Sequence, residues 1–183
     1  MNNLDQFIHL CAHEILRRSA LADEHALALS EGARALAQAA ANSRIRSSLA
    51  CEAPVVESLD AAASTPLFTA AMAARNELCW MPSPRLDDNG TEAALAPLNK
   101  VRDLPGVICG LLAVGPNGVY PEHSHPPQEL YLPITGDGEW RYGGDTGVRK
   151  LARNALVYNN PDDVHAVYAG GQPLLAMYVL WPT

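Results

Sequence analysis

Three side chains able to bind a metal ion lie close together between residues 118 and 140. His123 and His125 are two residues apart, and Glu129 follows four residues after His125. Further along, His165 comes directly after the turn-like sequence NNPDDV and can supply a third imidazole. Imidazole nitrogen and carboxylate oxygen together suit Zn, Fe, Mn, Ni or Co at a mixed site. The four residues therefore predict a site for one divalent transition-metal ion per chain, whose identity the sequence leaves open.

The residues around this group indicate how it is positioned. Side chains two apart on a β-strand share a face, so His123 and His125 form one such pair. Glu129 and Tyr131 form a second pair by the same rule. The prolines at 126–127 cannot donate main-chain hydrogen bonds, so they interrupt the strand between the pairs. A turn there is expected to fold the two pairs towards one point.

The first part of the chain has a helical pattern. One helix is expected over the apolar positions between Leu4 and Leu16, and a second from about residue 23 to 41. A third helix is expected to open at Thr65-Pro66, because proline suits the first helical position. The candidate inner positions of the second helix are Leu27, Ala33, Leu36 and Ala40.

The character of the sequence changes near residue 77, and short strands separated by Gly, Pro, Asn and Asp turns follow. This pattern is typical of an all-β sandwich or barrel, of which the jelly roll is one solution. We expect one structural domain, in which a helical extension (1–76) packs on a barrel that carries the metal site (77–183). The loop MPSPRLDDNG is either an active-site lid or a plain connector. The expected strands are 107–114, 129–134, 139–142, 148–151, 155–158, 165–168 and 174–180.

The region from about residue 105 resembles the cupin family. HSHPPQE, followed by six residues and Gly136, resembles the first cupin motif, HxH-x3-E-x6-G. Residues 161–165, PDDVH, are similar to the second motif, P-x-G-x-x-H, but one residue shorter. The resemblance implies a mainly-β cupin (jelly-roll) barrel with an N-terminal helical extension. It also implies that His123, His125, Glu129 and His165 hold the metal, although His123 is alternatively placed beside the ion, where it positions the substrate.

A narrower resemblance is to the cupin-type dimethylsulfoniopropionate (DMSP) lyases. It rests on Glu129-Leu130-Tyr131, on Tyr120 before the histidine pair and on the helical extension. It implies β-elimination of DMSP to acrylate and dimethyl sulfide, with the metal holding the substrate carboxylate. Tyr131 is expected to act as the base, and Tyr120 to position the substrate or assist proton transfer. Aromatic faces attract a sulfonium cation, so the candidates for binding it are Trp80, Tyr142, Trp181 and, in addition, Tyr158.

Other functions are compatible with the same ligand set. Three histidines and a glutamate also suit a cupin Fe(II) dioxygenase acting on a small organic acid or thiol. A non-catalytic cupin that binds a ligand, as a sensor or sugar-binding module, is a second alternative. An isomerase, or a lyase acting on another small carboxylate, is a third. The fold does not decide among them, because cupins carry many chemistries.

Composition limits the partners. The net charge is -7 with only 13 Lys and Arg, and no clustered basic face of a nucleic-acid-binding protein is present. No apolar run reaches the ~20 residues that span a bilayer, and the N-terminus does not resemble a signal peptide. Cys11, Cys51, Cys79 and Cys109 form no CxxC pair and are expected to be buried free thiols, which favours a reducing compartment. We therefore expect a cytoplasmic enzyme with a small-molecule substrate and no nucleic-acid or membrane partner. A homodimer remains open.

Overall fold

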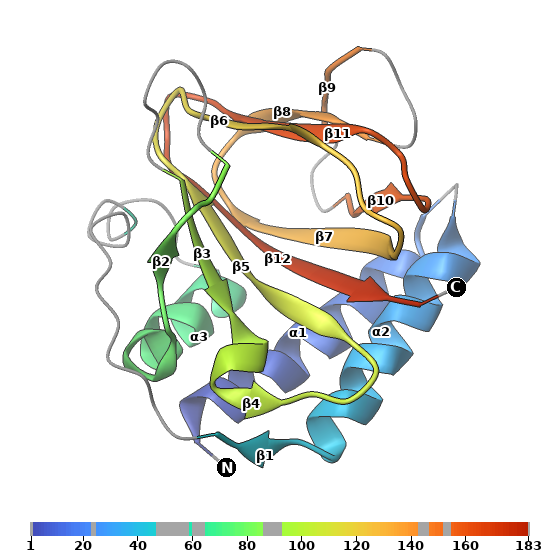
Figure 1. The fold of residues 1–183 in the computed structure, drawn as a ribbon, viewed down its shortest axis with the longest axis vertical. Coiled ribbons are helices and arrows are strands. Elements are labelled where there is room, and N and C mark those ends of the chain that lie inside the picture. Colours follow the sequence, from blue (N-terminus) through green and yellow to red (C-terminus); the bar gives the residue numbers. More distant parts are fainter. Residues whose placement is uncertain are drawn as a thin grey trace.

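The elements of the chain form three layers in the computed structural model (Figure 1). Three helices cover one face of a six-stranded sheet, and a four-stranded sheet lies over its other face. The residues that the structure describes are 2–22, 25–46, 59, 65–85, 93–142, 147–151 and 155–182.

The three predicted helices are confirmed. Asn2 begins the first helix, since its side chain accepts a hydrogen bond from the backbone of Asp5. Thr65 caps the third in the same way, with Pro66 at its first position. The prediction for Leu27 was wrong, because it is 81% exposed and the helix turns other residues inward. The helices are α1 (Asn3–Ser19), α2 (Ala26–Ala41) and α3 (Pro66–Ala74), with short 3-10 turns η2 (Arg75–Glu77) and η3 (Leu98–Lys100).

The strands are antiparallel throughout the two large sheets. The six-stranded sheet has the order β10 (Val157–Asn159), β7 (Gln128–Thr135), β12 (Leu174–Trp181), β5 (Ile108–Val114), β3 (Ala93–Pro97), β2 (Met81–Pro82). The four-stranded sheet has the order β6 (Val119–His123), β11 (His165–Ala169), β8 (Gly138–Arg141), β9 (Arg149–Lys150). A small third sheet pairs β1 (Arg44–Ile45) with β4 (Arg102–Asp103).

Each of the seven predicted strands is present, with ends shifted by up to two residues. The sequence did not predict β6 or the strands β1 to β4. The two large sheets face one another without joining into a single closed barrel.

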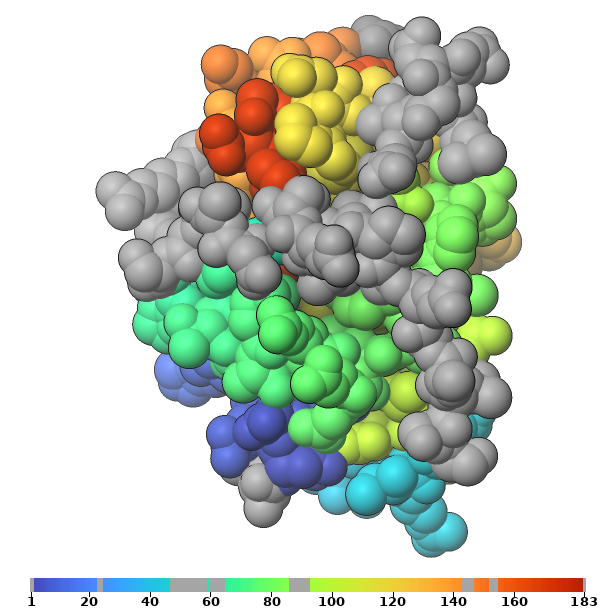
Figure 2. All heavy atoms as spheres, turned by 90° about the vertical axis from the view of Figure 1, so that its left-hand side faces the viewer, coloured from blue at the N-terminus to red at the C-terminus, as the bar shows by residue number. Residues whose placement is uncertain are grey.

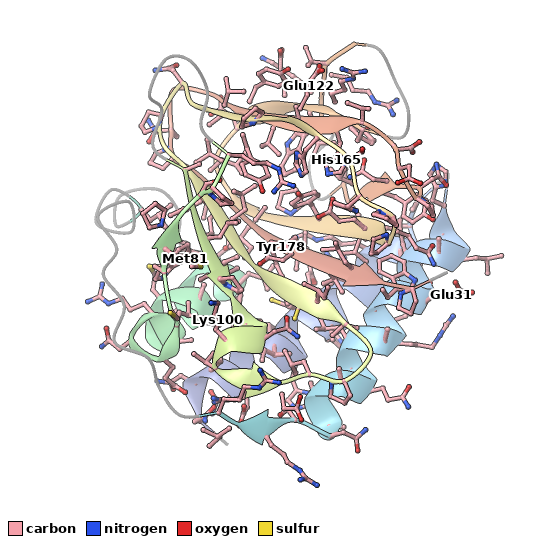
Figure 3. The ribbon with its side chains drawn as sticks, in the orientation of Figure 1. Glu31, Met81, Lys100, Glu122, His165 and Tyr178 are labelled. Atoms are coloured by element: carbon pink, nitrogen blue, oxygen red, sulfur yellow. The ribbon has the colours of Figure 1, made fainter. Side chains whose placement is uncertain are left out.

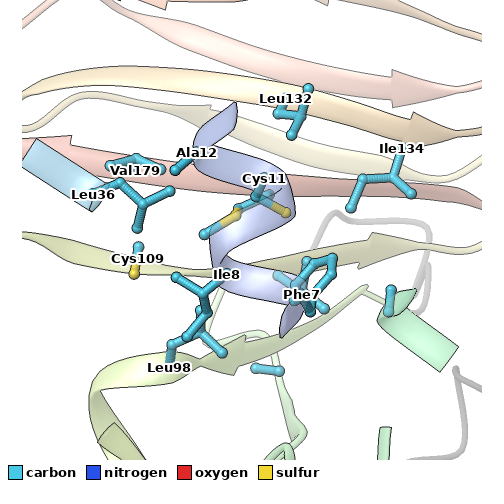
Figure 4. Close-up of a cluster of buried hydrophobic side chains, with 14 of the residues drawn as sticks. Phe7, Ile8, Cys11, Ala12, Leu36, Leu98, Cys109, Leu132, Ile134 and Val179 are labelled. Carbon is cyan, nitrogen blue, oxygen red and sulfur yellow. The ribbon is translucent and has the colours of Figure 1, made fainter. Parts of the chain in front are cut away.

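Side-chain alternation along β12 separates two cores. Met177 and Val179 point to the helices, while Leu174 and Ala176 point to the four-stranded sheet. In Figure 4, α1 contributes Phe7, Ile8 and Cys11 to the helix-facing core, against side chains of β7 and β12. The second core fills the space between the sheets, and we call that space the inter-sheet core. Its buried members include Tyr120, Tyr131, Trp140 and Val167.

The cysteines depart in part from the expectation. Cys11 and Cys109 are buried free thiols, as predicted. Cys79 is disulfide-bonded, so the prediction for it was wrong. Cys51 lies outside the described residues. Because disulfides persist in oxidising environments, the cysteines no longer favour a reducing compartment.

One buried cation connects the helical layer to the region beyond residue 77. Arg102 of β4 is 4% exposed and lies 3.1 Å from Asp5 of α1 and 3.5 Å from Glu77. In Figure 2, the teal-green α3 lies directly above the blue start of α1. The division at residues 76 and 77 stays a prediction. No helix in the described part of the chain is long and apolar enough to cross a membrane.

Candidate metal and active site

Three predicted metal ligands converge between the sheets. His123 ends β6 and is the register partner of His165, which begins β11, and their ring centroids are 4.1 Å apart. His125 lies in the bend before β7, with its ring centroid 5.0 Å from that of His165. One ligand nitrogen of each histidine lies within 4.8 Å of the other two. His165 points into the space between the sheets in Figure 3, whereas Glu122 lies on the outer side.

The structure corrects how the first two histidines are positioned. They were expected to share one face of a strand, but β6 ends at His123. The chain then bends through residues 124–127 and re-enters the six-stranded sheet at Gln128. The expected turn at the prolines is present, and it brings Glu129 towards the histidines.

Backbone carbonyls fix the orientation of all three imidazoles. Nδ1 of His123 lies 2.8 Å from the carbonyl oxygen of Pro121, and Nδ1 of His125 lies 3.0 Å from that of Pro127. Nδ1 of His165 lies 2.8 Å from the Asp163 carbonyl oxygen. A carbonyl oxygen only accepts, so each Nδ1 carries a proton, and in the neutral form of each imidazole the lone pair is on Nε2. Metal-binding histidines are oriented by such contacts.

Glu129 completes the group from the opposite sheet. Its Oε2 lies 3.0 Å from Nε2 of His165 and 3.3 Å from Nε2 of His125. Asn159 of β10 donates a hydrogen bond to the same oxygen at 3.2 Å. Burial alone would raise the pKa of Glu129, but the neighbouring His125 and His165 outweigh it and lower the pKa to about 2. The carboxylate is therefore ionised at neutral pH.

The donor set fits a divalent transition-metal ion. Nε2 of His125 and Nε2 of His165 are buried, and neither makes a well-aligned hydrogen bond despite the nearby carboxylate. Buried polar atoms without partners are rare, and a place for a bound ion is one explanation for them. Burial, followed by the nearby His165, lowers the pKa of His123 to about 4, so this imidazole is neutral at pH 7. Neutral nitrogens and one carboxylate are the ligands of a mixed N/O site.

Both catalytic tyrosines of the sequence prediction lie beside this group. Tyr131 shares the inner face of β7 with Glu129, and its ring is 6.4 Å from that of His165. The ring of Tyr120 is 4.8 Å from that of His123. Burial, and then the charge of Glu129, raise the pKa of Tyr131 well above its ordinary value. A divalent cation held by the histidines would act in the opposite direction on this pKa.

The aromatic residues expected to bind a sulfonium are not gathered at the histidines. Trp80 and Trp181 belong to the helix-facing core, on the other side of the six-stranded sheet, and so does Tyr158. Tyr142 borders the inter-sheet core, but the Arg149 guanidinium lies 4.0 Å from the centre of its ring. This placement does not support Trp80 or Trp181 as residues that contact a substrate beside the metal ligands.

Sequence reasoning missed several residues at the site. Arg85 and Ser83 adjoin Tyr120, Asn159 adjoins Glu129, and Tyr178 lies opposite Tyr131 in the sheet. Two of these residues could have been found from the sequence, since Tyr178 lies on a predicted strand and Asn159 lies in the turn that follows one. Arg85 lies in the loop MPSPRLDDNG, for which the sequence left a lid and a plain connector open, and only the fold shows that its side chain reaches Tyr120.

Two facing antiparallel sheets with convergent histidines and a glutamate between them define a cupin, and the fold class predicted from the sequence is confirmed. A DMSP lyase from Ruegeria pomeroyi DSS-3, DddQ, has a similar structure, with a TM-score of 0.65 and 18% identity over 76% of this chain and 77% of its own. One chain from the crystal structures of the DMSP lyases RdDddP and RnDddQII gives the same TM-score and identity, over 77% of this chain and 78% of its own. The DMSP lyase family model matches residues 29–176, so this chain belongs to the DMSP lyase family. It is thus a carbon–sulfur lyase of the cupin fold. No curated protein matches the sequence.

Proposed function

We propose that this enzyme cleaves DMSP to acrylate and dimethyl sulfide by β-elimination, with Tyr131 as the base. The observation that supports this most directly is the position of Tyr131. Tyr131 is 2% exposed and shares a strand face with Glu129, which itself lies within 3.3 Å of two of the three histidines. A base at this place reaches a substrate that is held at the ligand group.

The residues that would hold the metal are His125, Glu129 and His165, with His123 as a fourth ligand or as a neighbour that positions the substrate. A divalent cation there supplies positive charge next to the substrate carboxylate, which makes the adjacent C–H bond more acidic. Glu129 is kept ionised by its histidine neighbours, and the three Nδ1 contacts hold the imidazoles in place before substrate arrives.

The elimination needs one proton transfer. The Tyr131 phenolate takes the proton from the carbon next to the carboxylate. The electron pair of that C–H bond forms the double bond of acrylate, and the pair of the C–S bond leaves with sulfur. The leaving group is neutral dimethyl sulfide, so no acid has to protonate it. Tyr120 positions the substrate or relays the proton from Tyr131 onward, since its ring lies against His123.

The deciding experiment is turnover without oxygen. The metal-loaded protein is incubated anaerobically with DMSP, and headspace dimethyl sulfide and dissolved acrylate are measured. We expect both products in equal amounts, and neither after the metal is removed by chelation. Product formation that requires O2 would instead identify a dioxygenase. Binding of DMSP without any product would identify a ligand-binding protein or an enzyme for another small carboxylate.

A further inference from the structure

Arg85 is held at the edge of the site by a short turn. Ser83 continues from β2, and its backbone N–H donates to the carbonyl of Ala93 at 2.8 Å. The buried Ser83 hydroxyl then accepts a hydrogen bond from the backbone N–H of Arg85 at 3.1 Å. These two bonds fix the start of the Arg85 side chain relative to the six-stranded sheet.

The guanidinium of Arg85 reaches the residues beside the metal ligands. Its Nη1 donates a hydrogen bond to Oη of Tyr120 at 3.2 Å, and its Cζ lies 5.9 Å from the centre of the Tyr120 ring. The same tyrosine ring contacts His123, with 4.8 Å between the ring centroids. A permanent positive charge therefore lies one aromatic ring away from the histidine group.

Arg85 is half-buried, and within the described part of the chain its guanidinium has one hydrogen-bond acceptor, the Tyr120 hydroxyl. Among the described residues, the ion pairs of the other arginines are formed with Glu14, Glu77, Asp5, Asp103 and Glu122, and none includes Arg85. A guanidinium has five N–H donors in a planar fork that matches a carboxylate. The Tyr120 hydroxyl occupies one of them. The remaining donors suit an anionic group that enters beside Tyr120.

We propose that Arg85 binds the carboxylate of the substrate and so determines which way round a zwitterion enters the site. This rests on the proposed function for the identity of the substrate. Its positive charge attracts the carboxylate and repels the sulfonium, so the cationic end lies away from Arg85. The site then selects short molecules whose carboxylate is near the bond to be broken, and it binds carboxylates that carry no cation at all.

The test measures binding separately from turnover. Titration calorimetry on the metal-loaded protein uses propanoate, which has only the carboxylate, and trimethylsulfonium, which has only the cation. Arg85→Gln should weaken propanoate binding by about 10- to 100-fold, the value of a charge-assisted hydrogen bond. Its affinity for trimethylsulfonium should be unchanged or higher. Arg85→Lys keeps the positive charge but not the planar guanidinium, so it should lose less affinity for propanoate than Arg85→Gln. The control is Arg34→Gln, an exposed arginine on α2, which should bind both probes like the parent.

Two further measurements separate the alternatives. If Arg85 only holds Tyr120 in place, then Tyr120→Phe alone should weaken propanoate binding as much as Arg85→Gln does, and the double variant should add nothing. That result, or equal propanoate affinity in Arg85→Gln and the parent at equal metal content, would overturn the proposal. If the parent releases no dimethyl sulfide from DMSP but still binds propanoate through Arg85, the proposed function fails and Arg85 is the carboxylate site for another acid. In kinetics on DMSP, KM should rise more than kcat falls.

Discussion

Backbone carbonyls determine which ring nitrogen of each of the three histidines carries a proton. This prepares the site for a cation, because Nδ1 is occupied and Nε2 faces the other ligands. His123, His125 and His165 each direct Nδ1 to a carbonyl two residues away. His123, His125 and Glu129 lie in one short stretch of sequence and His165 ends the second motif, so these donors were predictable. Arg85 was not, because its distance in sequence from Tyr120 is large and only the folded sheet brings the two together.

Removing the Tyr131 hydroxyl tests the base directly. Tyr131→Phe should keep the parent metal content, because the histidines and Glu129 are unchanged, and should lose elimination by about 100- to 10,000-fold, as expected for a general base. Metal analysis and headspace dimethyl sulfide are the two measurements. Tyr168→Phe is the matched control, since Tyr168 alternates with two residues of the inter-sheet core and so points away from it. Residual turnover near the parent rate in Tyr131→Phe would exclude Tyr131 as the base.

A buried thiol makes the stability of the protein fall as the pH rises in the alkaline range. Burial raises the pKa of Cys109 to about 12, whereas an unfolded thiol ionises near ~8.5. The folded state therefore keeps its proton longer than the unfolded state, so stability is complete below pH ~8.5 and declines as the pH rises towards 12. The loss from this group is about 1.4 kcal/mol per pH unit in that window. Urea unfolding from pH 8 to 10.5 should show a shallower decline in Cys109→Ala than in the parent, and equal slopes would contradict the assignment.

At the scale of elements, α2 packs closely on the end of β12. A Cβ on Gly32 would lie 2.6 Å from a Leu130 methyl and 2.7 Å from the Trp181 ring. Trp181 is therefore part of the contact between helix and sheet, which explains its place in the helix-facing core.

Gly32→Ala should destabilise the protein despite improving the helix. Crowding the ring costs about 1–3 kcal/mol, while alanine returns at most about 1 kcal/mol of helix propensity. We expect a net loss of about 1–2 kcal/mol in chemical denaturation. Gly171→Ala, at a glycine with nothing within 4 Å of the added carbon, is the control and should be close to neutral. If Gly32→Ala is as stable as this control, then α2 can shift away from Leu130 and Trp181 without a loss of stability.

The elements that the sequence predicted correctly share one property. Strands such as β5, β7 and β12 are rich in apolar residues and end in Gly, Pro or Asn turns. In contrast, β3 has the sequence AALAP, and alanine and proline are both disfavoured in strands. It forms because β5 and β2 pair with it on either side. β2 has two residues, too few for a periodic signal.

For the whole molecule, the helices and sheets are expected to unfold together. The helix-facing core takes residues from α1, α2, α3 and the six-stranded sheet without a break. Arg102 adds an ionic connection between α1, β4 and η2. A single cooperative transition, with far-UV and near-UV dichroism coinciding, is the expected behaviour of one domain.

Arg102→Met tests that connection. The substitution removes the buried guanidinium and leaves two partly exposed carboxylates without their partner. We therefore expect the free energy of unfolding to fall by about 2–3 kcal/mol, less than the ~3–5 kcal/mol for fully buried pairs. The control is Arg46→Met, whose pair with Asp103 is about half exposed and worth ~1 kcal/mol or less. Both are compared by urea unfolding. Equal losses would mean that Arg102 contributes no more than a surface ion pair.

The metal donors come from both layers of the sandwich, with His123 and His165 on the four-stranded sheet and Glu129 on the six-stranded one. An ion bound by all of them is a cross-link between the sheets. At a thousand times its Kd it would add about 4 kcal/mol to the free energy of unfolding, so chelation should lower the melting temperature as well as stop turnover. In a cell short of the metal, the ion-free chains would then be the first to unfold and be degraded, and the amount of enzyme would follow the supply of metal.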